Sequence, residues 1–148
     1  MREWFQNSML NHPECRKTTS GVTMSSSELH KLPTRVVDIG PSGSNIDPHL
    51  INTSGYPDGN WVTLSHYNIT ERLDGIPMSS MPKSFVDAIA VTKALALRYI
   101  WIDSLCIIQE DEEDWVAESK HMGSIYEKAV LTVAASSAED SRKGLCIQ

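Results

Sequence analysis

The sequence has few cysteines, no cluster of positive charge and no long hydrophobic run. Its three cysteines, at positions 15, 106 and 146, are too few and too scattered for a disulfide framework or a tetrahedral zinc site. Lys and Arg number 13 against 19 Asp and Glu, so a surface for nucleic acid is not expected. No apolar run reaches the roughly 18 residues of a membrane span, and no apolar core of a secretory signal follows Met1. We therefore expect a cytoplasmic protein without a membrane span, a metal or a cofactor.

The composition is that of one ordinary globular domain. The chain has 148 residues, of which 41% are hydrophobic and 22% are charged. Residues 3–10 predict a short amphipathic helix, and the Ser/Thr-rich residues 18–27 predict a linker. The sequence thus divides into an N-terminal helix and linker, residues 1–30, and an α/β domain, residues 31–148.

Strand and helix signals alternate along the second part. Apolar, β-branched runs that end at polar residues or turns predict strands, and apolar residues at helical spacing predict helices. The expected strands are residues 35–39, 61–65, 99–102 and 130–135. The expected helices are residues 81–97 and 112–128, and residues 42–60 form a long loop or hairpin region. The order from residue 61 onward is strand, helix, strand, helix, strand, which predicts a mostly parallel sheet built on a βαβαβ core with flanking helices.

The second expected helix begins after five consecutive acids, residues 110–114. A metal site is one interpretation. We favour a helix start, because acids in the first turn complement the helix dipole. The helix is expected to place the following residues on one side: Trp115, Met122, Ile125, Tyr126 and Ala129.

Asp103 is the most prominent candidate for a functional residue. It interrupts the most apolar run of the chain, residues 98–109, at the point where the strand should end. In parallel sheets, ligands bind outside the carboxyl ends of strands, so an acid there is a candidate binding or catalytic residue. Alternatively, Asp103 pins the next turn through its own backbone. The sequence leaves both interpretations open.

The expected topology brings three strand ends to one edge of the sheet. These ends are Ser65–His66, Asp103–Ser104 and Ser136–Ser137, which makes Ser65, His66 and Ser104 candidate binding residues. A Ser-His-Asp hydrolase is disfavoured, because adjacent strand residues point to opposite faces and the Gly-x-Ser-x-Gly pattern is absent.

Two further side chains are candidates for a chemical role. Glu118, like Asp103, could stabilise a cationic sugar transition state, although no spacing selects such a reaction. Cys106 lies among Leu105, Ile107 and Ile108, which favours a buried, inert thiol over a nucleophile.

Several long motifs of the chain together match one family. They are Arg98–Gln109, Asp114–Trp115, Glu118, Met122–Tyr126 and Ala129–Ala135, with the upstream pieces His12–Cys15, Leu32–Asp38, Val62–His66 and Ile76–Ile89. In these motifs the sequence resembles the fungal heterokaryon incompatibility (HET) domain, and the resemblance covers nearly the whole chain.

The resemblance implies a signalling module of fungal non-self recognition, in which incompatible fusion triggers programmed cell death. It also implies self-association or protein partners. HET domains are thought to be distantly related to Toll/interleukin-1 receptor (TIR) domains, which implies a TIR-like α/β fold. Some TIR domains consume NAD, so an NAD-hydrolysing enzyme is the alternative, with Asp103 and Glu118 as its catalytic candidates by remote analogy.

Two departures from the family pattern indicate a truncated or internally deleted member. The loop that the family usually carries after the strand ending at Ser65–His66 is missing between Tyr67 and Asn68. The chain also stops at Gln148, where the family usually continues. A non-functional remnant is therefore a further alternative.

Overall fold

The computed structural model describes residues 29–65 and 81–134 of the chain. The predicted N-terminal helix and linker, His66 and Ser136–Ser137 lie outside these residues, so the predictions made for them stay predictions. The described elements are β1 (Arg35–Asp38), β2 (His49–Asn52), β3 (Trp61–Ser65), α2 (Lys83–Ala94), β4 (Tyr99–Ile102), α3 (Asp103–Cys106), α4 (Glu112–Lys128) and β5 (Leu131–Ala134). None of the described helices is long and apolar enough to cross a membrane.

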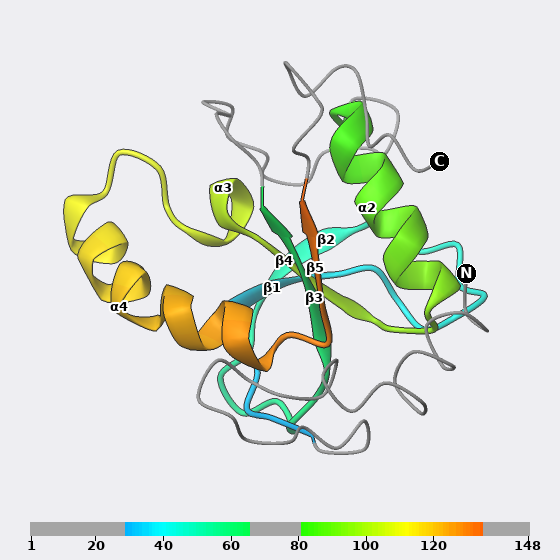
Figure 1. The fold of residues 1–148 in the computed structure, drawn as a ribbon, viewed down its shortest axis with the longest axis horizontal. Coiled ribbons are helices and arrows are strands. Elements are labelled where there is room, and N and C mark those ends of the chain that lie inside the picture. The colour runs from blue at the N-terminus through cyan, green and yellow to red at the C-terminus, as the bar shows by residue number, and fades with distance from the viewer. Residues whose placement is uncertain (1–28, 66–80, 135–148) are drawn as a thin grey trace.

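The sheet is mixed, in the strand order β2-β1-β4-β3-β5 (Figure 1). Strand β3 pairs in parallel with β4 and with β5, as the βαβαβ order predicted. Strand β1, however, pairs antiparallel with both β2 and β4. The prediction of a mostly parallel sheet was therefore wrong, while the α/β class was correct.

A hairpin explains the antiparallel half of the sheet. After β1 the chain turns through Gly40 and Gly43, whose φ angles of 76° and 86° are ones that side chains disfavour. The Asp38 carboxylate accepts a hydrogen bond from the Gly40 N–H at 2.8 Å, which stabilises the start of this turn. The chain then returns as β2 within the predicted loop or hairpin region. A hairpin needs no crossover helix, so nothing forces β1 to run parallel to β4.

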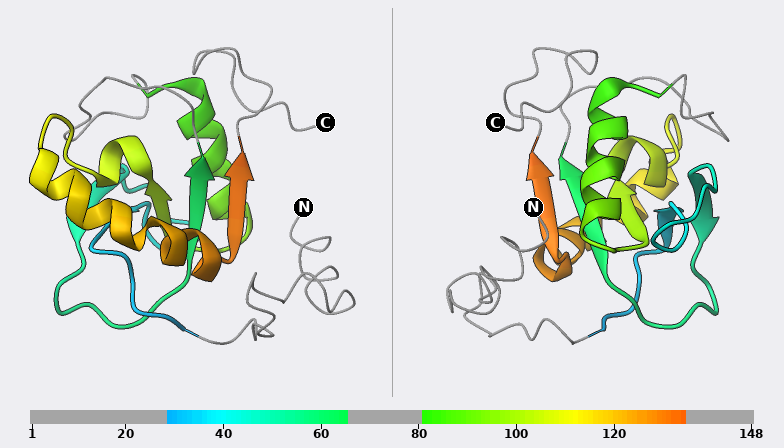
Figure 2. Two further views of the ribbon diagram at one scale, coloured as in Figure 1. Left: turned by 60° about the vertical axis from the view of Figure 1, so that its left-hand side comes forward. Right: turned by 90° about the vertical axis from the view of Figure 1, so that its right-hand side faces the viewer.

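The sheet is covered by α2 on one face and α4 on the other (Figure 2). Helix α2 buries Phe85, Ala88 and Ile89 in the core. On the opposite face the indole N–H of Trp61 donates to the Ile125 carbonyl of α4 at 3.1 Å. Both predicted helices are thus present and lie on opposite sides of the sheet.

The acids before α4 start the helix, as predicted. The Asp111 side chain caps it by accepting a hydrogen bond from the Asp114 N–H at 3.0 Å. Glu112, Glu113 and Asp114 then form an acidic first turn, while Lys128 lies in the last turn. This charge order complements the helix dipole at both ends.

Candidate functional site

The carboxyl ends of β3 and β4 lie side by side. Their parallel register pairs Leu64 with Ile102, so Ser65 and Asp103 follow as neighbours at the same edge of the sheet. Ser65 is exposed and Asp103 is half-buried. Because side chains alternate along a strand, Ser65 shares the face of Trp61, which is the face that α4 covers. The sequence predicted this meeting of two strand ends, and the third predicted end lies outside the described residues.

Tyr126 of α4 lies beside these two strand ends and forms with Ser65 and Asp103 what we call the Tyr126 cluster. Its hydroxyl shares a hydrogen bond with the Ser65 side chain, and its ring meets the Trp101 ring edge-on, with centroids 5.5 Å apart. Burial and the negative charge of Asp103 raise the pKa of Tyr126, and the Ser65 hydrogen bond only partly opposes them. The sequence placed Tyr126 on an apolar helix side and missed its polar role, because the rotation of α4 fixes where the hydroxyl points.

Asp103 accepts hydrogen bonds from the local backbone and also belongs to the Tyr126 cluster. Its carboxylate accepts a hydrogen bond from the Ser104 N–H at 2.7 Å, and its carbonyl accepts one from Ile107 at 3.0 Å. The turn-pinning interpretation therefore describes a contact that is present. The Ser104 hydroxyl and the Trp101 indole N–H are buried without a hydrogen-bond partner. The cluster thus offers the exposed Ser65 hydroxyl and the half-buried Asp103 carboxylate for a polar ligand at the sheet edge.

The Tyr126 contacts predict a measurable pH effect. Because the folded-state pKa of Tyr126 lies above the value of about 10 of an unfolded tyrosine, its contribution to stability is complete below about pH 10. That contribution is lost as the pH rises through the folded-state pKa. At pH 8, Tyr126→Phe should lower the free energy of unfolding by about 1 kcal/mol, because the hydrogen bond to Ser65 is lost. Between pH 8 and pH 11, the variant should lose less stability than the wild type.

Urea denaturation at the two pH values tests this expectation. Tyr56→Phe is the matched control, because Tyr56 is 46% exposed. If Tyr126→Phe loses as much stability as the wild type between pH 8 and pH 11, the role assigned to Tyr126 is contradicted.

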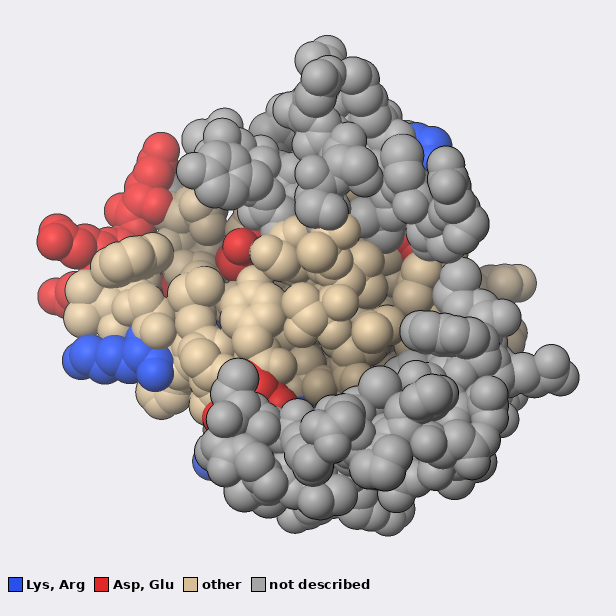
Figure 3. Space-filling model, viewed as in Figure 1, with Lys and Arg blue, Asp and Glu red and all other residues tan. Residues whose placement is uncertain are grey.

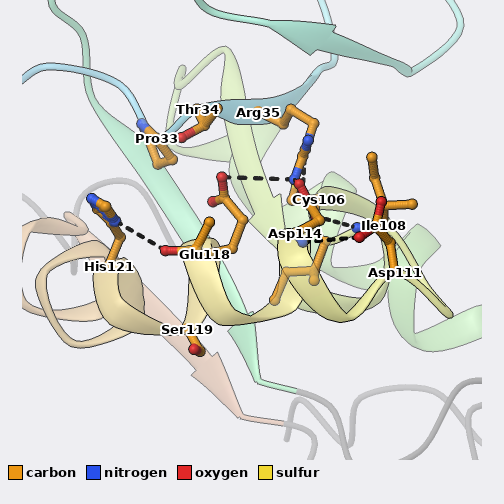
Figure 4. A network of polar contacts seen from close by, with 12 residues as sticks. Pro33, Thr34, Arg35, Cys106, Ile108, Asp111, Asp114, Glu118, Ser119 and His121 are labelled. Carbon is orange, nitrogen blue, oxygen red and sulfur yellow. Dashed lines mark hydrogen bonds and ion pairs between the residues drawn. The ribbon is translucent and has the colours of Figure 1, made fainter.

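Glu118, unlike Asp103, faces Arg35 in a network of polar contacts. Figure 4 shows this network. Its side chain is buried, and its Oε1 atom lies 3.7 Å from the Arg35 guanidinium, while Oε2 has no hydrogen-bond partner. The Arg35 Nη2 also donates to both oxygens of Asp114 at 2.7 and 2.6 Å. The Arg35 Nε donates to the Cys106 carbonyl at 2.6 Å. Glu118 therefore belongs to a network that joins β1, α3 and α4.

Cys106 is an inert thiol, as its apolar neighbours predicted. Its side chain is fully buried, and burial raises the pKa of the thiol to about 12. The charges of Asp103 and Glu118 raise this pKa further, although a backbone hydrogen bond and Arg35 oppose them. A thiol with so high a pKa is not a nucleophile at neutral pH.

A comparison with protein families gives one match. The model of the family described as heterokaryon incompatibility protein (HET) matches residues 57–148. The match includes β3, α2, β4, α3, α4 and β5, and it leaves out β1 and β2. No curated protein and no solved structure matches the chain.

Proposed function

We propose, from the premise that this chain belongs to the heterokaryon incompatibility (HET) family, that it is a signalling module of fungal non-self recognition whose activation leads to programmed cell death. The family assignment rests on a match to more than half of the chain. The signalling function is the step beyond it, and it requires a surface through which the module binds itself or another protein.

An exposed apolar surface on α4 carries this proposal. We call it the α4 patch, and it consists of Trp115 and Val116 at the start of the helix and of Ile108 in the segment before it, which are 57%, 41% and 48% exposed. The sequence placed Trp115 on one side of the helix with Met122 and Tyr126, and it is exposed although those two residues are half-buried. Figure 1 shows the first turns of α4 farther from β3 and β5 than its last turns.

The surroundings of the α4 patch indicate the chemistry of its partner. Glu110, Asp111, Glu112 and Glu113 are all exposed at this end of α4, and Figure 3 shows acidic side chains gathered there. A partner surface with basic residues around an apolar recess would complement them. Exposed tryptophans of this kind are frequent binding hot spots, and their truncation often costs 2 kcal/mol or more in affinity.

The NAD-consuming alternative has less support. Its two candidate acids have different environments: Asp103 bonds to the Ser104 N–H, and Glu118 is buried beside Arg35. We therefore rank protein association above nucleotide hydrolysis. NAD turnover by the purified chain that is lost in Asp103→Asn would reverse this ranking.

Expression in a filamentous fungus tests the proposed function. We expect the wild-type chain to reduce viability, and Trp115→Ala to abolish this effect by weakening association at least about tenfold. The variant should keep the wild-type melting temperature within about 2 °C, because Trp115 packs against little of its own fold. Lys83→Ala, on the opposite face of the sheet, is the control and should remain toxic.

Two outcomes contradict the proposal. A harmless wild type at confirmed expression would remove the signalling function for this chain. A Trp115→Ala variant as toxic as the wild type would show that the α4 patch does not carry the signal.

A further inference from the structure

A cavity of about 250 Å³ lies between the segment before β1 and the C-terminal half of α4. It is found at the amino end of β3, where Trp61 lies, and thus at the opposite end of that strand from Ser65. Figure 4 shows this side of α4, with Pro33 and Thr34 across from His121. Neither the α4 patch nor the Tyr126 cluster includes a residue that lines the cavity.

The inner wall of the cavity is apolar and rigid. It is formed by Leu32, Trp61 and Ile125, which are 6%, 1% and 4% exposed. The Trp61 indole is held by its hydrogen bond to the Ile125 carbonyl, and the Trp61 carbonyl accepts a bond from the Val130 N–H at 3.0 Å. A wall that is ordered before binding lowers the entropy cost of holding a ligand.

The mouth of the cavity is positively charged. Lys31 approaches from the segment before β1, and Lys128 approaches from the last turn of α4. No Asp or Glu is among the described residues that line the cavity. Among the described residues, neither lysine has an ion-pair partner. In a chain with a net charge of −6, two unpaired cations over an apolar wall favour an anionic ligand.

Pro33, Thr34, His121 and Ser124 complete the lining. The His121 Nδ1 lies 3.3 Å from the Ala117 carbonyl, which can only accept, so the ring donates this bond through Nδ1 and leaves Nε2 for a ligand. The Ser124 hydroxyl donates to the His121 carbonyl at 3.0 Å, which leaves its oxygen lone pairs free. The cavity therefore provides acceptors beside its two cations, and a ligand with a hydroxyl or N–H group could use them.

We propose that this cavity binds a small organic anion. Its phosphate or carboxylate group pairs with Lys31 and Lys128, and its aromatic or aliphatic body rests on Leu32, Trp61 and Ile125. The cavity volume equals that of about eight water molecules in the liquid and lies just below the range of drug-sized pockets. It therefore fits a compact phosphate or carboxylate ester and is too small for a dinucleotide.

Titration of the isotope-labelled full chain with phenyl phosphate tests the proposal by NMR. We expect a saturable shift of the Trp61 indole N–H signal. The Lys31→Gln, Lys128→Gln double variant should bind phenyl phosphate about tenfold more weakly, because charge-assisted hydrogen bonds are lost. Lys83→Gln is the matched control, since it removes another exposed lysine, from α2, and should bind like the wild type.

The same titration with two simpler probes separates the contributions. Inorganic phosphate should bind more weakly because it lacks the apolar body, and phenol should bind more weakly because it lacks the charge. Phenol that binds as tightly as phenyl phosphate would overturn the anion assignment. An unchanged affinity in the double lysine variant, or binding that leaves the Trp61 signal in place, would overturn the site itself.

Discussion

Replacing Arg35 by alanine is expected to lower the free energy of unfolding by about 3 kcal/mol, the lower end of the range for breaking a buried ion pair. Arg35 donates to the Asp114 carboxylate and to the Cys106 carbonyl, so one side chain holds β1 against both α3 and α4. Without it, the Asp114 carboxylate keeps the hydrogen bond from the Ile108 N–H, and Glu118 loses the cation beside it. The Arg35 and Asp114 side chains are 15% and 16% exposed, which is why we expect the lower end.

Chemical denaturation of three variants measures this effect. Arg35→Lys should recover only part of the loss, because an ammonium cannot donate to the carboxylate and the carbonyl in the same planar geometry. Lys83→Ala is the control, because the exposed pair of Lys83 and Asp87 should contribute no more than about 0.5 kcal/mol. A loss below about 1 kcal/mol in Arg35→Ala would show that the network does not hold the elements together.

The pH dependence of the same variants gives an independent check. Burial raises the pKa of Asp114, but the hydrogen bonds from Arg35 and Ile108 lower it by more, so the net shift is downward. A depressed pKa stabilises the fold above about pH 4, and this contribution is lost as the pH falls through the folded-state value. The difference between the wild type and Arg35→Ala should therefore shrink in acid.

The piece that matches the family model, residues 57–148, is expected not to fold by itself. It lacks β1 and β2, so β4 loses its antiparallel neighbour and becomes an open edge. It also lacks four core side chains that are at most 6% exposed: Leu32, Val36, Val37 and Ile39. Each such side chain contributes about 1.5–3 kcal/mol through burial. The sum over the four side chains is comparable to the whole stability of an ordinary domain, about 5–15 kcal/mol.

Circular dichroism and thermal unfolding of two fragments test this expectation. Residues 57–148 should show no cooperative transition, and residues 29–148 should unfold cooperatively like the full chain. A cooperative transition in the shorter fragment would mean that β1 and β2 are dispensable.

The sequence predicted α2, β4, α4 and β5 because each one has a local signal, and it did not predict the short helix α3. The acids at residues 110–114 indicated the start of α4, and the apolar run before Asp103 indicated β4. The direction of β1 had no such signal. It depends on the pairing of Val37 with Ile100, two residues far apart in the sequence, and the short runs around them are equally compatible with either direction.

The candidate site was predictable only in part, for the same reason. The adjacency of Ser65 and Asp103 follows from parallel pairing alone. The hydrogen bond of Tyr126 to Ser65 depends on how α4 is rotated against the sheet. The burial of Glu118 could not be predicted either, because a lone glutamate is normally exposed. Arg35 accounts for it, and Arg35 approaches from a strand at the opposite end of the described chain.

The network around Arg35 has a consequence for synthesis on the ribosome. Arg35 and Asp114 are separated by 79 residues, so at 5–20 residues per second Arg35 waits about 4–16 s for its partner to be made. During that interval the face of the growing sheet that α4 later covers remains open, and Trp61 has no Ile125 carbonyl to bind. Chaperones that bind nascent apolar segments therefore have a defined window of action on this chain, which closes when α4 leaves the exit tunnel.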